Sequence, residues 1–485
     1  MNRETRRILH VSEREHWGDG CLDRDARLHR RISVTAAGAL VLIVLASGCA
    51  RFEPARVRRE QTGSFTTNLA RLAEGELDRP VSLNDCVLIA MSNNYEVRKA
   101  DLNRELYRIG KNVAFTAFLP NVAVSAGYKS YEKDPVNTEQ EFDSFQADIS
   151  MPIFMPSTWF LYAAARHGYA AAGTAAAYVR QGIVLQTTVN YFNVLVQQDT
   201  VAALESQLAA AREGAQRVQG LTEEGFFAKW EGDQALYIAE ARETELNRAR
   251  RHLAVVRGEL LRGLGLSPAA RVELSGETGQ AAAPTGTVEE LVLKALEIHP
   301  ELSIADRQVV IRQHQVRQAF CDFLPTISLF HTGQWTSDDL AAQSENWVSG
   351  FSGAWKVFDS FANVARYKAA RVERRQTELE RESTFLSIMV QVIAAEAAAR
   401  DAVEGARIRR RAYDVATAKF ADYDARSREG LIPLSDALDA RAAMDLAQVA
   451  LVQSRYQERI AIANLDLAMG ITLIPDPKTE TKEAK

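Results

Sequence analysis

Few residues of this chain are arranged for chemistry. Its eight histidines are scattered and match no metal-binding or hydrolytic spacing, and the chain has neither a Walker-type glycine loop nor a Gly-x-Ser-x-Gly elbow. The stretch "GLGLS" at 263–267 has no preceding strand, so it is predicted to end a helix rather than to hold a phosphate. We therefore expect no enzymatic activity and neither a metal nor another cofactor.

One cysteine does stand in a reactive setting. Cys49 ends the stretch "LVLIVLASGC", part of an apolar run that follows Arg30 and Arg31. That run is shorter than the roughly 20 residues of a membrane helix. A basic flank, an apolar run and small residues, in this order, predict a secretion signal over 1–48. The alternative is that Cys49 is a buried thiol at the edge of a core helix.

The quartet "ASGC" that ends at Cys49 resembles the lipobox of bacterial lipoproteins. The resemblance implies that Cys49 becomes the first residue of the mature chain and carries a covalent lipid, the only attached group that we expect. Ala50 is compatible with export to the outer membrane. The charged residues 1–28 ahead of the basic flank indicate an over-long signal or a misassigned start.

The composition bounds the class of protein. The chain has 485 residues, is 47% hydrophobic and has a net charge of −5, which is typical of a folded protein of two or three domains. Its mild acidity argues against a nucleic-acid partner. No apolar run after Cys49 reaches the length of a membrane helix, so any crossing requires the strands of a closed barrel. Cys86 and Cys321 are predicted to be free core thiols.

An internal duplication organises the chain. The segment that begins at Val87 matches the segment that begins at Val292, without gaps, at an offset of 205 residues. The same offset places Gly225 on Gly430, so two structurally equivalent halves are expected. The predicted segments are a signal peptide (1–48), a lipidated linker (49–81), a first repeat (82–274), a linker (275–287), a second repeat (288–470) and a polar tail (471–485).

Each half is predicted to begin with one helix, over 83–117 or 288–322, which ends at Phe-Leu-Pro. Pro120 and Pro325 then mark the turns from helix to strand. In "DSFQADISMPIF", large apolar residues alternate with polar ones such as Asp148, as in a strand with two unlike faces. The stretches "NVAVSAGY", "TISLFHTGQW" and "NWVSGFSGAWKVF" behave similarly. Four strands in two hairpins fit the length of tilted membrane strands, and a soluble β-subdomain is the alternative.

Very long helices are predicted after the strands, over 157–220 and 360–427. They are rich in alanine, which has high helix propensity and a small side chain. Each is expected to break near a glycine, Gly225 or Gly430, before the chain resumes a helix. Sixty helical residues extend about 90 Å and need coiled-coil partners. This length suits a structure that spans the periplasm.

The lipobox, the tandem halves, the Phe-Leu-Pro turns and the glycine-broken helices together resemble the TolC-like outer-membrane efflux factors, in their lipoprotein branch. The resemblance covers about residues 80–470. It implies a mainly α fold with a β-barrel part: a long α-helical coiled-coil barrel plus four transmembrane β-strands per chain. The resemblance also implies that three chains form one twelve-stranded barrel. Self-association is required in any case if these strands lie in the membrane, because four strands cannot close in lipid by themselves. On that barrel the polar face of Asp148 would line the lumen and Phe145 and Trp347 would face lipid.

The resemblance also implies a function and partners. The protein is expected to be a passive trimeric conduit in the outer membrane of a Gram-negative bacterium, with helices that extend into the periplasm. Its implied partners are a periplasmic adaptor protein, an inner-membrane RND-type or ABC-type transporter and outer-membrane lipid, while the cargo stays open. The alternative is a lipid-anchored periplasmic coiled-coil adaptor, which would need neither four amphipathic strands nor the duplication.

The stretch "EGLIPLSDALDARAAM" resembles the tip segment of that family and implies that Asp436 and Asp439 line the periplasmic aperture. A spacing of three places both carboxylates on one helix face, and threefold symmetry would repeat them as cation-attracting rings. The alternative is that these acids stabilise a helix N-terminus. The first half has Glu231 and Gln234 instead, so Glu231 would add a weaker ring. Ile432 stands where some members have an arginine that locks the closed state.

Overall fold

The computed structural model describes residues 53–133, 135–276 and 286–471. The chain divides into two compact units, 1–68 and 69–485, and helix α2 (Pro54–Glu76) spans the boundary between them. The second unit contains all the other described elements. None of the described helices combines the length and the hydropathy needed to cross a membrane.

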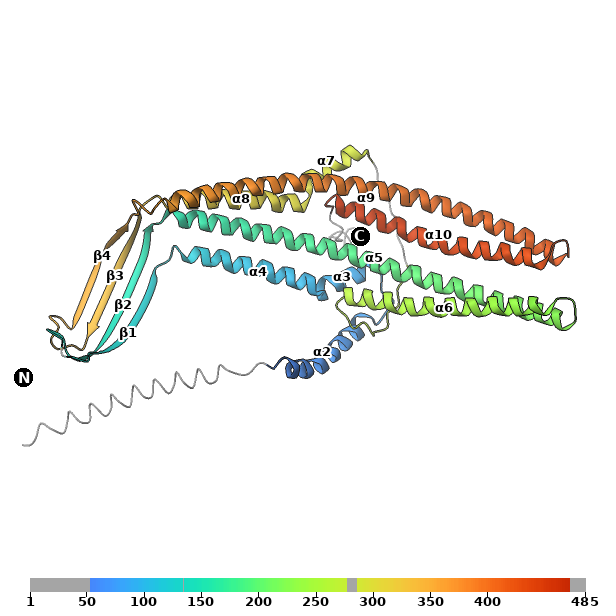
Figure 1. Cartoon of the computed structure of the whole chain (residues 1–485), viewed down its shortest axis with the longest axis horizontal. Coiled ribbons are helices and arrows are strands. Elements are labelled where there is room, and N and C mark those ends of the chain that lie inside the picture. Colours follow the sequence, from blue (N-terminus) through green and yellow to red (C-terminus); the bar gives the residue numbers. More distant parts are fainter. Residues whose placement is uncertain (1–52, 134, 277–285, 472–485) are drawn as a thin grey trace, which may run out of the picture. The chain divides into compact units, whose positions relative to one another are not determined.

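Both halves have the same order of elements (Figure 1). The first half consists of α3 (Leu83–Asn93), α4 (Tyr95–Thr116), β1 (Asn121–Ser130), β2 (Glu141–Phe154), α5 (Pro156–Glu223) and α6 (Lys229–Gly263). The second half consists of α7 (Val288–Ile298), α8 (Pro300–Cys321), β3 (Thr326–Thr336), β4 (Glu345–Ala354), α9 (Ala362–Arg428) and α10 (Leu434–Ala468). The mainly helical fold with four strands and the positions of the long helices are confirmed.

The prediction of one unbroken helix at the start of each half is wrong. Asn94 and His299, which the duplication makes equivalent, leave the helical conformation with ψ angles of 131° and 126°. The Asn94 side chain accepts a hydrogen bond from the N–H of Glu96 at 2.8 Å. Nδ1 of His299 accepts one from the N–H of Glu301 at 3.3 Å. Each residue thus caps the next helix, and in the second half Pro300 also disfavours a helical conformation at the residue before it.

The capped breaks lie against the ends of α6 and α10. Gly265 and Gly470 follow these helices with φ angles of +72° and +71°, a conformation that glycine adopts without strain. A Cβ atom on Gly265 would lie 2.4 Å from the carbonyl oxygen of Asn93, and one on Gly470 would lie 3.0 Å from Cα of His299. Glycine therefore allows the end of one helix to approach the break between two others.

The four strands form one antiparallel sheet in the order β1-β2-β3-β4. The hairpin of each half joins the other through β2 and β3, where Phe145 lies opposite Trp335. The predicted extent of the last strand, through "WKVF", is wrong, because β4 ends at Ala354. Its partner strand begins at Thr326, opposite Ala354, so the ladder has no further partner residues. Trp355 lies beyond it, and its Nε1 donates to the carbonyl oxygen of Phe323 at 3.1 Å.

The long helices pack side by side (Figure 1). Next to the sheet the order of contacts is α4-α5-α8-α9, and toward the hairpin ends it is α6-α5-α10-α9. Helices α5 and α9 are long enough to take part in both arrangements. Helix α5 therefore has neighbours on both sides, whereas α9 lies at one edge and α4 and α6 lie at the other.

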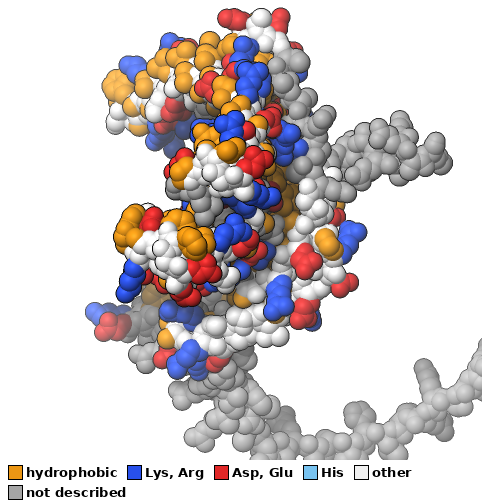
Figure 2. Space-filling model, turned by 90° about the vertical axis from the view of Figure 1, so that its right-hand side faces the viewer, with side chains coloured by type: hydrophobic (Ala, Val, Ile, Leu, Met, Phe, Trp, Pro, Cys, Tyr) orange, Lys and Arg blue, Asp and Glu red, His pale blue; other side chains and the backbone are white. Residues whose placement is uncertain are grey.

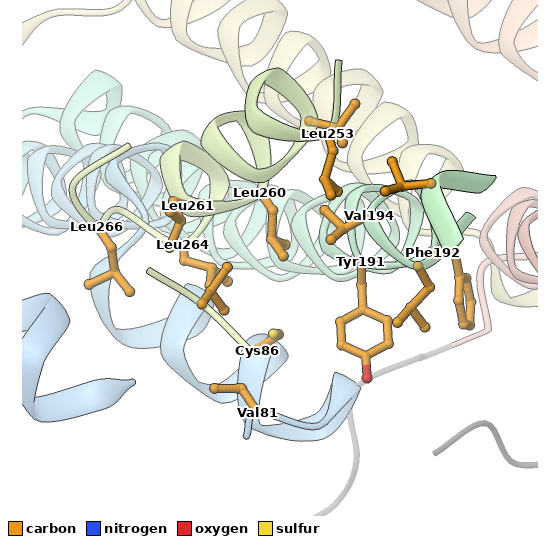
Figure 3. Packing of buried hydrophobic residues seen from close by; sticks show 14 of the residues in the cluster. Val81, Cys86, Tyr191, Phe192, Val194, Leu253, Leu260, Leu261, Leu264 and Leu266 are labelled. Carbon is orange, nitrogen blue, oxygen red and sulfur yellow. The ribbon is translucent and has the colours of Figure 1, made fainter. Parts of the chain in front are cut away.

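The larger hydrophobic core lies in the first half, where α3, α5 and α6 meet (Figure 3). Tyr191 and Leu260 are completely buried there, close to Cys86. A smaller core surrounds Ile388 of α9 in the second half. Cys86 and Cys321 are free and buried, which confirms their prediction as core thiols. Burial raises the pKa of Cys86 to about 12, so it stays protonated and unreactive.

Candidate functional site

The sheet has one apolar face, as the alternating strand patterns predict. The pairing register places Val124, Ala147, Gly333 and Trp347 in one row on this face. Its large exposed side chains include Val122, Phe145, Ile149, Leu329, Trp335, Trp347 and Phe351. Most of the large apolar residues of the four strands therefore lie on the same side, which suits contact with hydrocarbon.

The opposite face of the sheet is polar. Asp148 accepts hydrogen bonds there from Oγ1 of Thr332 at 2.8 Å and from Nε2 of Gln146 at 2.8 Å. Nε2 of Gln334 donates in turn to Oε1 of Gln146 at 3.4 Å. This row of hydrogen bonds joins β2 of the first half to β3 of the second. A polar face behind an apolar one is the arrangement of a strand between water and lipid.

In the described part of the chain, the edge strands and edge helices have no neighbour on their outer sides. Strands β1 and β4 each pair on one side only, and the edge helices expose apolar residues at coiled-coil spacing. On α4 these residues are Leu102, Leu106, Ile109 and Val113, between 47% and 66% exposed. On α9 they are Val372, Leu379, Leu386, Val390 and Ile393, between 46% and 67% exposed. We call them the α4 stripe and the α9 stripe, and such continuous exposed surfaces mark interfaces.

The hairpin ends have the same backbone in both halves. Gly225 follows α5 with a φ angle of +85°, and Gly430 follows α9 with one of +74°. The N–H of Phe226 donates to the carbonyl oxygen of Leu221 at 2.8 Å, and the N–H of Leu431 donates to an equivalent carbonyl at 2.9 Å. These bonds define Schellman motifs, which explains why a glycine ends each long helix.

The candidate aperture residues lie at the start of α10. Asp436 is in its first turn and Asp439 follows one turn later, both exposed to solvent. In the first half, the carboxylate of Glu231 accepts the N–H of Ala228 at 2.7 Å and so caps α6. Asp436 occupies the equivalent position at the start of α10, where a negative charge also stabilises the helix N-terminus. Ile432 is half-buried in the preceding loop.

The two predicted prolines mark the turns from helix to strand. Pro120 and Pro325 each directly precede a strand, β1 and β3. Cys49 and the signal segment before it lie outside the described residues.

Sequence reasoning missed the exposed aromatic residues at the hairpin end of the first half. Phe226, Trp230 and Tyr237 are 74%, 65% and 69% exposed. Figure 2, which views these ends, shows hydrophobic side chains at the surface among charges of both signs. Trp230 and Tyr237 are seven residues apart on α6, and this heptad spacing is the signal that could have found them.

Two aromatic clusters at the junction of helices and sheet were also missed. Phe115, Phe118 and Tyr162 form one cluster, with ring centroids 5.8 to 6.2 Å apart. The second consists of Phe320, Phe323 and Tyr367, each 205 residues later, with centroids 6.2 to 6.4 Å apart. The duplication could have predicted this correspondence, because each tyrosine lies at the same offset as the phenylalanines.

A histidine pair lies between the halves. The rings of His167 on α5 and His314 on α8 stack with centroids 5.5 Å apart. Burial lowers the pKa of both histidines, and nearby arginines such as Arg307 and Arg317 lower it further. These cationic surroundings disfavour a metal ion, and within the described residues no three His, Cys, Asp or Glu side chains converge to hold one.

Comparisons with known proteins agree with this architecture. A family model described as outer membrane efflux protein matches residues 88–266 and 291–471. A membrane protein from Pseudomonas aeruginosa has a similar structure, at 20% identity and a TM-score of 0.70 over 82% of this chain and 92% of that one. No curated protein sequence matches the chain.

Two channel structures are similar as well. The Campylobacter jejuni CmeC outer membrane channel matches at 18% identity and a TM-score of 0.71, over 83% of this chain and 88% of that one. The open state of the Neisseria gonorrhoeae MtrE outer membrane channel matches at 18% identity and a TM-score of 0.70, over 82% and 91%. At these identities the likeness concerns the fold.

Proposed function

The chain belongs to the outer membrane efflux protein family, and from this premise we propose that three copies of it close into one conduit. As a member it is an outer-membrane channel component of a tripartite efflux system, and its helices extend into the periplasm. The three copies would contribute twelve strands to one barrel, whose polar face would line the lumen. Three is the number that the TolC-like resemblance implies.

One observation carries the proposal: the sheet and the helices end at the same two edges. Strand β1 follows α4 at one edge, and β4 precedes α9 at the other. When the β4 edge of one copy meets the β1 edge of the next, the free backbone groups of both strands pair. In lipid each unpaired group would cost several kcal/mol.

The same contact covers the apolar surfaces of the helices. It brings the α9 stripe of one copy to the α4 stripe of its neighbour. Because these two edges are different surfaces, the contact is heterologous, and it closes only as a ring. A soluble β-subdomain would not need its strand edges and its helix edges to coincide.

The hairpin ends would then form the periplasmic aperture. Asp436 and Asp439 supply acidic rings there, supported by their exposure at the start of α10, and Glu231 supplies a weaker ring. A periplasmic adaptor protein and an inner-membrane transporter of the RND or ABC type would dock at this end. A lipid on Cys49 would anchor each chain to the outer membrane.

The native mass of the complex tests the proposal. The full chain is extracted in mild detergent from separated inner and outer membranes and measured by native mass spectrometry, with Cys49→Ser as the control for lipid. We expect three chains, in the outer-membrane fraction, each with an acyl group on Cys49. A monomer, or a location in the inner membrane, would contradict the shared barrel and favour the adaptor alternative.

A further inference from the structure

The helix turns next to the sheet are strongly basic. Four segments adjoin the strands: the end of α4 (104–116), the start of α5 (156–170), the end of α8 (307–321) and the start of α9 (362–375). Together they contain twelve Lys and Arg residues but only two acids, although the whole chain has a net charge of −5. We call the basic residues of these four segments the basic collar. The four strands themselves contain four acids and one lysine.

Several charges of the collar have no acidic partner. Arg317, Lys368 and Arg371 are exposed and form no ion pair within the described part of the chain. The guanidinium of Arg317 lies 6.0 Å from the ring centroid of Phe160, and that of Arg371 lies 6.0 Å from the ring centroid of Tyr367. Ion pairs compensate five other arginines of the collar. The three unpaired charges have no such partner, so they repel their neighbours unless an external anion compensates them.

The position of the collar indicates which anion this is. From the sheet outward along the adjoining helices, the apolar face of the sheet is followed by the aromatic clusters around Tyr162 and Tyr367, and these are followed by the collar. At 1.5 Å per residue, Tyr367 lies about 8 Å and Arg371 about 14 Å from the start of α9. Hydrocarbon, an interfacial layer that favours aromatic residues and a phosphate layer follow one another in the same order in a membrane leaflet.

We propose that the basic collar binds the anionic phospholipid headgroups of the periplasmic leaflet of the outer membrane. The inference rests on the proposed function, because it requires the sheet to lie in that membrane. The surface potential of anionic lipid decays within a Debye length of about 8 Å. The turns nearest the sheet should therefore contribute most, and long Arg and Lys side chains can extend toward the phosphates.

The test compares two triple variants of the full chain. The collar variant carries Arg317→Gln, Lys368→Gln and Arg371→Gln. The control carries Arg409→Gln, Arg411→Gln and Lys419→Gln, three charges that are also exposed and lie in the half of α9 farther from the sheet. Glutamine preserves helix propensity in both. Each protein is reconstituted in vesicles of phosphatidylcholine, or of an equimolar mixture with phosphatidylglycerol, and the lipids that it retains after mild extraction are counted by native mass spectrometry.

We expect the wild type and the control to retain phosphatidylglycerol preferentially, and added salt to reduce this preference. In the collar variant the preference for phosphatidylglycerol should fall about tenfold or more, because each Lys or Arg near an anionic surface contributes to the attraction. Equal preference in the wild type and the collar variant would overturn the inference, as would an equal loss in the control. Altered ion selectivity of the channel without altered lipid retention would assign the collar to the lumen instead. A monomer that retains no lipid would contradict the proposed function itself.

Discussion

Helices α5 and α9 are equivalent by the duplication, but their surroundings differ sharply. They have 68 and 67 residues and each ends at a glycine of the same conformation. Yet α5 has 22 buried residues among those described, whereas α9 has seven. The cause is position: α5 lies between α4 or α6 on one side and α8 or α10 on the other, whereas α9 lies at an edge.

The duplication therefore repeats the backbone of the two halves but not the surroundings of their helices. Both helices keep apolar residues at coiled-coil spacing. The residues of α5 are covered within the chain, whereas the α9 stripe is covered only if a second copy supplies a helix. In the proposed trimer the α9 stripe would be an interface between copies, so its substitution should affect assembly before it affects the fold.

Charged substitutions on the α9 stripe should have the strongest consequence for assembly. Leu386→Glu with Val390→Glu places two carboxylates on the α9 stripe, where the monomer tolerates them because the positions are exposed. In the assembled conduit they would be buried without partners, at a cost of several kcal/mol each. We expect folded monomers and no trimer, measured by native mass and by resistance to proteolysis.

The matched control is Val194→Glu on α5, at a position that is completely buried within the chain. It should prevent folding altogether, so that the protein is degraded before it can assemble. If the α9 double variant still yields intact trimers, the stripe is not the interface between copies.

The second prediction compares the glycines that follow α6 and α10. Gly265→Ala forces a Cβ against a backbone oxygen and strains a positive φ angle, so we expect a loss of roughly 3 kcal/mol in the free energy of unfolding. Gly470→Ala should cost less, because its nearest contacts are longer. Gly225→Ala, in open space, should cost about 1 kcal/mol, the strain alone. Chemical denaturation of the three variants gives the order, and equal losses would show that the close approach to Asn93 has no energetic role.

The third prediction compares the two hairpin ends. Asp436→Ala with Asp439→Ala should raise the single-channel conductance several-fold and increase antibiotic sensitivity in cells, because it removes the side chains that would narrow the resting aperture. Glu231→Ala should mainly remove a helix cap, at about 1 kcal/mol of stability, and change conductance little. Planar-bilayer recordings of the conductance of both variants, made on trimers of equal yield, distinguish the two effects. Unchanged conductance in the double aspartate variant would leave these acids with a structural role only.

Much of this architecture could be predicted from local patterns. The period-two alternation around Asp148 determines which side of the strand is polar, and the register aligns the other strands with it. The glycines at 225 and 430 mark helix ends because a Schellman motif needs a positive φ angle there. Such features depend on neighbours in the sequence.

Other features depend on neighbours in space and escaped prediction. The break at Asn94 requires the end of α6, whose carbonyl at Gly263 accepts Nδ2 of Asn94 at 2.7 Å, and nothing in the local sequence signals that contact. The exposure of Trp230 depends on which helices flank α6. The proposed role of Asp436 depends on symmetry copies of the chain, because an acidic ring exists only where three chains converge.

The smallest expected effect concerns the caps Asn94 and His299. Burial lowers the pKa of His299, with the Glu301 carboxylate opposing this shift and the ring of Tyr178 packed 5.7 Å away. Only an unprotonated Nδ1 can accept the N–H of Glu301. The stability that the neutral ring contributes is therefore complete above the ordinary histidine pKa of about 6.5, and it is lost as the pH falls toward the lower folded value.

The substitution His299→Asn should give the second half the cap of the first, which has no titratable group. We expect the loss of unfolding free energy in mild acid to become smaller by about 1 kcal/mol, measured by denaturation of the purified channel over a range of pH. The reverse change, Asn94→His, should introduce a new acid sensitivity into the first half. His167 and His314 also have lowered pKa values. Both are present in every variant, so their contribution cancels when the pH dependence of the variant is subtracted from that of the wild type. If the wild type and His299→Asn lose stability in parallel, protonation does not break the cap, and the two halves differ at this position in residue type alone.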